Sequence, residues 1–407
     1  MTEPEPSPAS KRGTATLAAF VLLFFALSWF TLTASYIRSS ELDIASDSLI
    51  KQISRAAYYA SIVFSSVIGS VLARKVKRMS LLVGWMAGGV VLSLVPALFV
   101  SVTEWQLLAV SVLLGSAFGI GMPACLALFA ELVRLEVRGT LSGAVFLTSN
   151  LAIAVLTVAM EGMEARTLIM VAGIWRGIGL ALFLLLRPRQ NMEAEARKQV
   201  SFISVFRNRR FLLYFVPWLA FCLIDFFENP VRQSLFEEIA PLASVAGLVI
   251  GSVSAIVGGV FADRIGRKVV VLYSFVSIGL AYAVLTIAPH NTAVLYFYTT
   301  INGIAWGILT SIFILTLWGD LSQPNEREVY YAIGNIPFFL AAIIELAVQP
   351  YASFIREETA FSLAAFFLFL AVLPLLYAPE TLPEKRIKEM ELKGYLEKAK
   401  KLKEKHA

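Results

Sequence analysis

Long apolar stretches recur along the whole chain, and short segments between them hold most of the charged residues. Each stretch is near the ~20 residues that an α-helix needs to cross ~30 Å of hydrocarbon. Such runs are too long for barrel strands, and only helices or closed barrels satisfy their backbone in lipid. The pattern predicts an all-α integral membrane protein with twelve transmembrane helices, at about residues 15–37, 55–73, 80–101, 106–128, 139–160, 167–186, 211–229, 242–261, 269–288, 293–317, 329–353 and 360–378.

Composition excludes a soluble globule. The 407 residues are 58% hydrophobic and 16% charged, whereas a soluble domain carries roughly 25% charge. The mean hydropathy of +0.73 points the same way. So few charges could not cover the surface of a soluble domain of this size.

The basic residues indicate the orientation. Of the 35 Lys and Arg residues, 28 lie before the first helix, in the even-numbered connections or after the last helix, and only 6 lie in the odd-numbered connections. By the positive-inside rule both termini are cytoplasmic, in a multi-pass protein of the cell membrane. Topology therefore explains the net charge of +6, and no nucleic-acid partner is predicted.

Five segments follow from these spans. They are a disordered cytoplasmic lead (1–14), a six-helix bundle (15–187), a cytoplasmic linker with a short helix near 192–206 (188–210), a second six-helix bundle (211–378) and a basic cytoplasmic tail (379–407). Apolar residues at helical spacing in the tail predict a helix. It is either solvated or lies on anionic lipid.

The two bundles are related by a repeat. The segments 69–78 and 258–267, after the second and eighth helices, match at an offset of 189 residues. At the same offset Glu131 corresponds to Asp320 and Arg138 to Arg327. Six helices per copy is an even number, so the two copies have the same orientation, as a parallel repeat.

Three segments resemble motifs of the major facilitator superfamily. Residues 259–268 read Gly-Val-Phe-Ala-Asp-Arg-Ile-Gly-Arg-Lys, which is similar to its signature loop Gly-x-x-x-Asp-Arg-x-Gly-Arg-Lys. Glu131 followed by Arg138-Gly139 resembles the pattern after helix 4 in its sugar porters, and Pro379-Glu380-Thr381 resembles their tail motif. The resemblance covers the membrane region and implies two parallel bundles that transport a solute by alternating access.

The chain also departs from the family pattern. The loop in the first half has Arg74 in place of the acid and Lys77 in place of the glycine. The proline-rich motif of drug antiporters is absent from residues 142–152 of the fifth helix. That absence argues against a drug/proton antiporter, and the subfamily stays open.

A cytoplasmic latch is expected from the signature loop. A carboxylate such as Asp263 suits the positive N-terminus of a helix, and the resemblance implies that this helix is the fifth, which begins near Arg138. We hypothesise that Asp263, Arg138 and this helix end form the latch; the alternative is a solvated loop. Arg74 has the wrong sign for the same contact, and Glu326 is a candidate partner for it. The expected gate residues are Gly259, Asp263, Arg264, Gly266, Arg267, Lys268, Glu131, Arg138, Asp320 and Arg327.

Ionisable residues within apolar helices cost free energy and usually face a cavity or a partner. Arg176 lies near the bilayer centre, where it either contacts an anionic substrate or carboxylate or bonds to backbone carbonyls. Asp225 and Glu345 lie roughly 21 and 24 Å from the cytoplasmic ends of their helices. One or both are hypothesised to take up a proton, and the alternative is a hydrated position at the outer interface. These three are the candidate coupling residues.

Neutral polar residues are the candidates for the substrate cavity, which the resemblance places among helices 1, 4, 7 and 10. Ser28, Thr31 and Ser35 share one face of the first helix, and Asn302 precedes Trp306 by one turn in the tenth. Such a lining suits an uncharged or weakly charged organic solute. The alternative is that Ser and Thr pack helices together. The first helix has no acid within its apolar stretch, which argues against the proton symport of many sugar porters.

Enzyme chemistry is not predicted. Cys125 and Cys222 lie in apolar stretches without disulfide or metal-ligand spacing, and His290 and His406 lie outside the spans. No nucleophile elbow or phosphate loop occurs, so neither a cofactor nor ATP-driven transport is expected.

The sequence therefore favours a monomeric secondary transporter. Its expected partners are a small organic solute, the lipid bilayer and, as a candidate coupling ion, H⁺. A non-transporting sensor or scaffold and an efflux antiporter are the alternatives. Substrate, direction, and symport or uniport stay open.

Overall fold

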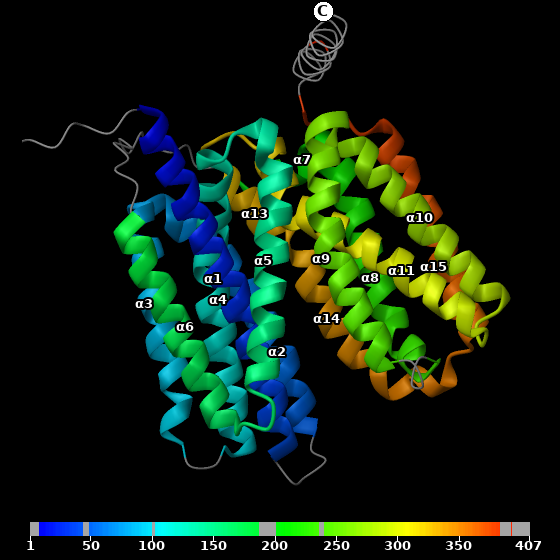
Figure 1. Cartoon of the computed structure of the whole chain (residues 1–407), viewed down its shortest axis with the longest axis horizontal. Coiled ribbons are helices and arrows are strands. Elements are labelled where there is room, and N and C mark those ends of the chain that lie inside the picture. The colour runs from blue at the N-terminus through cyan, green and yellow to red at the C-terminus, as the bar shows by residue number, and fades with distance from the viewer. Residues whose placement is uncertain are drawn as a thin grey trace, which may run out of the picture.

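The computed structural model describes residues 8–43, 49–99, 102–186, 201–235 and 240–382, together with Leu392. Within this part of the chain every regular element is helical, and twelve helices are long and apolar enough to cross a membrane. The all-α, twelve-helix prediction is confirmed. Figure 1 shows two bundles side by side, with the start of α1 and the end of α15 at one end of the molecule, called here the terminal end.

The first half consists of α1 (Pro8–Asp43), α2 (Leu49–Lys75), α3 (Arg78–Leu94), the 3₁₀ turn η1 (Pro96–Leu98), α4 (Glu104–Leu132), the 3₁₀ turn η2 (Leu135–Val137), α5 (Arg138–Ala159) and α6 (Ala165–Leu186). The second half consists of α7 (Phe202–Arg207), α8 (Arg209–Leu235), α9 (Ala240–Ile265), α10 (Arg267–Ile287), α11 (Thr292–Thr310), the π-helical segment η3 (Ser311–Leu317), α12 (Trp318–Leu321), α13 (Arg327–Gly334), α14 (Ile336–Val348), the 3₁₀ segment η4 (Gln349–Phe354) and α15 (Glu357–Tyr377). The tenth span joins α11, η3 and α12, and the eleventh joins α13, α14 and η4.

The helices extend beyond the apolar stretches. The first begins at Pro8, so residues 8–14 of the expected disordered lead are helical. Proline is well placed in a first helical turn, where its missing N–H costs nothing. Residues 1–7, residues 187–200 of the expected linker and most of the expected tail helix lie outside the described residues. Of the predicted linker helix, the described part is α7.

The two halves meet in two equivalent interfaces, because α5 packs against α9 and α14 packs against α2. Small residues allow the first contact. A Cβ atom on Gly259 would lie 2.2 Å from the carbonyl oxygen of Gly139, and one on Gly143 would lie 2.2 Å from that of Ala255. Glycine at these positions therefore brings the two backbones together, as is common between membrane helices.

Both long helices at the centre are irregular at the same level. Pro123 lies inside α4, and the π-helical segment begins at Ser311 in the equivalent tenth span. Position 123 corresponds to 312 at the offset of 189 residues. Proline removes one backbone hydrogen bond, and a π segment widens the turn.

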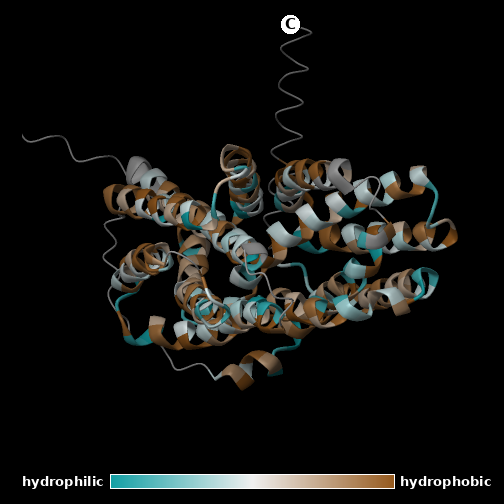
Figure 2. Ribbon diagram, turned by 90° about the horizontal axis from the view of Figure 1, so that it is seen from below, coloured by the Kyte–Doolittle hydropathy of each residue, from teal (hydrophilic) through white to brown (hydrophobic). Residues whose placement is uncertain are grey.

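The outer faces of the bundles are apolar. Figure 2 shows hydrophobic residues recurring along the helices, and several of the connections are hydrophilic. Large apolar side chains are exposed on many helices, among them Phe64, Leu185, Tyr273 and Phe366. Exposed apolar side chains on so many helices fit contact with lipid.

Candidate functional site

A cavity of about 300 Å³ lies between the two halves. Its walls are mainly apolar and aromatic, and no lining residue carries a charged side chain. The polar groups that reach it are hydroxyls, two amides and one indole. The lining residues are Leu27, Phe30, Thr31, Ser66, Phe118, Met122, Pro123, Leu126, Phe146, Ser149, Asn150, Ile153, Trp306, Thr310, Ile314, Tyr331, Asn335, Phe338 and Phe339.

The expected cavity residues separate into two groups. Thr31 and Trp306 line the cavity. Ser28 instead accepts a hydrogen bond from the Trp175 indole at 2.8 Å, and Ser35 is exposed away from the lining. Asn302 also lies outside the lining, and its buried Oδ1 has no hydrogen-bond partner among the described residues.

Helix rotation explains the difference in α1. The lining residues Leu27, Phe30 and Thr31 define the cavity-facing side, and Ser28 lies a further ~100° around the helix from Leu27. The sequence spacing gives the relative positions of these residues but not which side faces the cavity. The aromatic lining from α14, Phe338 and Phe339, carried no polar signal and was missed.

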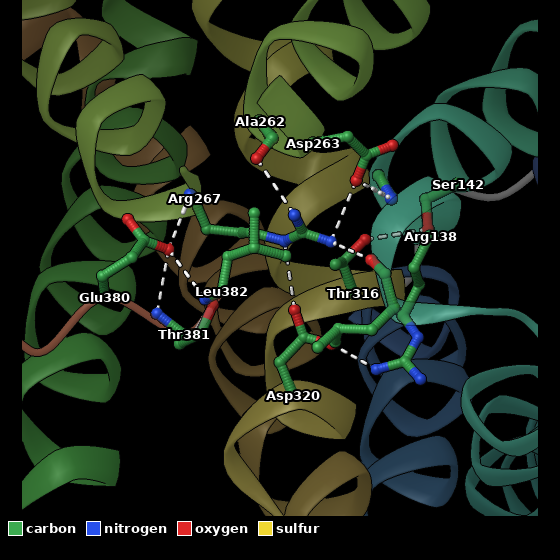
Figure 3. Close-up of polar contacts among 12 residues, drawn as sticks. Arg138, Ser142, Ala262, Asp263, Arg267, Thr316, Asp320, Glu380, Thr381 and Leu382 are labelled. Atoms are coloured by element: carbon green, nitrogen blue, oxygen red, sulfur yellow. Dashed lines mark hydrogen bonds and ion pairs between the residues drawn. The ribbon is translucent and has the colours of Figure 1, made fainter. Parts of the chain in front are cut away.

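The signature loop holds the terminal end of the two halves together (Figure 3). Asp263 at the end of α9 accepts hydrogen bonds from the backbone N–H groups of Gly139 and Thr140, at 2.9 and 2.7 Å, and from the Thr140 hydroxyl at 2.7 Å. These N–H groups belong to the first turn of α5, where no intrahelical acceptor exists and the helix dipole is positive. The expected contact of Asp263 with this helix end is therefore present in the structure.

The arginine partners differ from the hypothesis. Asp263 is 2.9 Å from Arg267 on its own loop, whereas Arg138 forms an ion pair with Asp320. Arg267 also reaches Asp320, at 3.1 Å. Asp320 thus joins one arginine from each half. Arg267 is fully buried, and it gives its remaining hydrogen bonds to the carbonyls of Ala262 and Leu135.

The first half contains an equivalent arrangement. Arg78 is 2.5 Å from Glu131, which is 3.8 Å from Arg327 of the second half. Arg78, Glu131 and Arg327 correspond to Arg267, Asp320 and Arg138 at the offset of 189 residues. We call these two sets the latch triads. In each, an acid bridges an arginine of its own half and one of the other half.

The acid equivalent to Asp263 stands at a different position in the other interface. Arg74 occupies the position equivalent to Asp263; its Nε donates to the Ser70 carbonyl, and its guanidinium lies 6.0 Å from the Phe202 ring. No hydrogen bond or ion pair joins Arg74 to Glu326 among the described contacts. The acid of this interface is Glu328, in the first turn of α13, which forms an ion pair with Arg78. Sequence reasoning missed it.

The tail motif also takes part. The Glu380 carboxylate accepts hydrogen bonds from the backbone N–H groups of Arg267 and Lys268, at 2.9 and 3.1 Å, and so caps α10. Gly266 precedes this helix with a φ of 104°, and a Cβ there would lie 2.3 Å from the Glu380 Oε2. A side chain at this position would be strained and would displace the cap. Arg264, the remaining expected gate residue, is exposed.

The candidate coupling residues occupy separate places. Arg176 is fully buried in the first half, with its guanidinium 4.8 Å from the Trp29 ring and 4.1 Å from the Trp85 ring. Its three nitrogens make no hydrogen bond within the described chain, so its charge interacts with the faces of these two rings through cation–π contacts. Asp225 is buried in the second half, and Glu345 accepts a hydrogen bond from Asn229 at 2.5 Å.

The sequence pattern of the Major Facilitator Superfamily matches residues 234–404. No curated protein matches the chain. Solved structures with a similar fold include a proton:xylose symporter of that superfamily bound to a bromodeoxyglucose (TM-score 0.65, 15% identity, 92% of this chain and 97% of that one).

Two further structures cover similar shares of the chain. They are a bacterial homologue of the iron transporter ferroportin in an outward-facing state (0.69, 13%, 90% and 98%) and the human organic anion transporter MFSD10 (0.63, 14%, 91% and 100%). The chain thus has the major facilitator fold, and its resemblance to the major facilitator superfamily is confirmed by the sequence pattern in the second half and by the architecture in both.

Proposed function

We propose that the protein is a secondary transporter, which moves a small organic solute across the membrane by alternating access of one central cavity. The observation that carries this proposal is that the cavity lies between the two halves while the latch triads join those halves at one end only of the described structure. Rocking of the halves would then break the triads and expose the cavity at the terminal end. The positive-inside rule favours a cytoplasmic location for that end.

The cavity chemistry suggests the class of solute. Rings of Phe30, Phe118, Trp306, Phe338 and Phe339 surround it, and such rings bind apolar or aromatic surfaces. A few hydroxyl and amide groups would orient the solute. An anion or cation would find no opposite charge on the lining, so an uncharged, largely apolar solute fits best. The same lining would also suit the export of apolar compounds, and efflux is therefore the second candidate.

The test is counterflow in proteoliposomes with a panel of aromatic and apolar solutes, and with sugars and organic anions for comparison. Phe338→Ala and Phe339→Ala should each weaken binding by about 1–3 kcal/mol, because a buried aromatic contact is lost. Phe366→Ala is the matched control, since that ring is 60% exposed on the outer surface. If correctly folded protein exchanges none of these solutes, the proposal fails and a sensor or scaffold role takes its place.

A further inference from the structure

A buried carboxylate cluster lies in the second half, beside the cavity. It consists of Asp225, Glu228 and Arg232 on α8, Tyr282 on α10 and Tyr298 on α11. Asp225 is 5% exposed and Glu228 1%. Sequence analysis had singled out Asp225 alone among these five residues.

The cluster has more acid than base. Arg232 is the one cation that faces both acids among the described residues: its Nε lies 3.5 Å from Glu228, and it acts electrostatically on Asp225. If both carboxyls were ionised, a net negative charge would be buried in hydrocarbon, at a cost of several kcal/mol. One proton removes that charge, since a single carboxylate matches Arg232.

The hydrogen count at Tyr282 points to the same conclusion. Its hydroxyl contacts Oδ1 of Asp225 at 3.2 Å and also forms a hydrogen bond with Oε1 of Glu228. A hydroxyl has one hydrogen to donate. The second contact is a full hydrogen bond only when a protonated carboxyl donates to the Tyr282 oxygen.

The surroundings indicate which acid holds the proton. Oε1 of Glu228 also lies 3.4 Å from the Tyr298 hydroxyl and faces Arg232, which favours the ionised form of Glu228. A proton that passes from Asp225 through the Tyr282 hydroxyl would arrive on Oε1 of Glu228, the oxygen that Tyr282 contacts.

Groups on the neighbouring helices complete the environment. On α14, the Glu345 carboxylate accepts a hydrogen bond from Asn229. It also interacts electrostatically with Asp225 and with Arg38. The α15 helix presents the apolar ring of Phe361, whose centre is 6.2 Å from that of Tyr282. On α8 itself the thiol of Cys222 faces Asp225.

Trp306 connects the cluster with the cavity. It lines the cavity, and it packs against the helix that carries Asp225. Its ring contacts Phe221 and Phe226 of that helix, with centres 5.0 and 5.8 Å apart. A solute that shifts the Trp306 ring therefore changes the packing of Phe226, the residue next to Asp225.

We propose that Asp225 and Glu228 share one exchangeable proton, bridged by Tyr282, and that Trp306 couples the release of this proton to the occupancy of the cavity. When Asp225 releases H⁺ to water, both carboxyls are ionised against one arginine. That state is unstable until the proton returns. This inference rests on the proposed transport function for its coupling part, whereas the shared proton itself is independent of any solute.

The shared proton is tested first, by infrared difference spectroscopy of the full chain in nanodiscs. The protein should show the C=O stretch of a protonated, deuterium-exchangeable carboxyl at neutral pH. Either Asp225→Asn or Glu228→Gln should abolish it, since the remaining carboxylate pairs with Arg232. Glu358→Gln, on an exposed side chain of α15, should leave the band unchanged. A band that survives in both cluster variants, or is absent from the parent protein, overturns the proposal.

Coupling is tested separately, with the solute found by counterflow. Asp225→Asn should lose the stimulation of uptake by a pH gradient but keep solute exchange, because exchange needs no net proton movement. Tyr282→Phe should shift the pH at which the infrared band disappears, whereas Tyr273→Phe, on the exposed face of the same helix, should not. Loss of the band together with unchanged gradient-driven uptake refutes the coupling. If no solute is exchanged, the proposed transport function fails, but the infrared experiment still tests the shared proton independently.

Discussion

The contact between Asp263 and the start of α5 makes a sharp prediction: Asp263→Asn should open the terminal end. Asparagine has nearly the same shape as aspartate but no charge. Its carbonyl oxygen can accept from Gly139 or Thr140, while its NH₂ group must then face a second donor. The substitution therefore removes one or two of the three hydrogen bonds to a charged acceptor.

The magnitude follows from the bonds that are lost. A hydrogen bond to a charged group contributes about 1.5–3 kcal/mol, and a partly buried anion at a helix N-terminus up to about 2 kcal/mol. Arg267 keeps Asp320 and two carbonyls, so its share of the loss is small. A net loss of about 2–4 kcal/mol would shift an open-to-closed ratio of about 1:99 to between about 1:3 and 9:1.

Electron–electron double resonance between spin labels at Arg134 and Gln323 would measure this shift. Both positions are exposed, at the terminal end, and belong to different halves. We expect a second, longer distance in Asp263→Asn. Thr140→Val removes only the hydroxyl donor and should give a smaller population, since that bond contributes about 1 kcal/mol.

An unchanged distance distribution in Asp263→Asn would refute this reasoning, provided that another variant shows that the labels respond. Gly259→Leu serves this purpose, because its side chain would collide with the Gly139 backbone.

Three further predictions concern the same structure. Gly259→Leu should open the terminal end more than Asp263→Asn does in the distance measurement, whereas Gly247→Ala, with no atom within 4 Å of the added carbon, should leave the distances unchanged. Glu328→Gln should favour opening by only about 1–2 kcal/mol, because Arg78 keeps Glu131; an effect above that of Asp263→Asn would contradict this view of the first-half interface. Arg176→Met should leave the thermal unfolding temperature equal or higher, since it removes a buried charge that has no hydrogen bond among the described residues, and the cost of burying that charge exceeds the lost cation–π contact. Arg176→Lys should lose about 1–2 kcal/mol of cation–π stacking, and loss of counterflow by a well-folded Arg176→Met would argue for a transport role of the arginine.

The sequence alone was enough to predict twelve spans, because the thickness of the bilayer sets the length of each apolar stretch. The uneven distribution of Lys and Arg between the connections likewise follows from how the chain crosses the bilayer. The offset of 189 residues also paired the members of the two latch triads correctly. It could not say which acid Arg138 would contact, since Asp263 and Asp320 both follow from the motifs. The contact depends on the rotation of α9 and α12 about their own axes, which decides which acid faces Arg138. This rotation cannot be predicted from the sequence pattern.

The carboxylate cluster was incomplete for a different reason. The predicted seventh span ends near residue 229, one residue after Glu228, and the sequence analysis did not single out Glu228. In the structure α8 continues to Leu235, and Glu228 is buried against two tyrosines from helices distant in sequence. Neither tyrosine carried a signal of its own, because an isolated Tyr in an apolar helix is unremarkable.

The paired irregularities of the fourth and tenth spans bear on how the two ends of the molecule communicate. In each span the irregular turn forms part of the cavity wall, at Pro123 and at Ile314 of the π segment, and it precedes the acid of a latch triad, Glu131 or Asp320. A regular helix would transmit any rotation at one end to the other as a rigid rod. Here the regular backbone hydrogen bonding of each helix is interrupted midway. In the proposed transport cycle, the cavity walls would then close around a solute while the latch is still intact, and occlusion would be a step separate from opening.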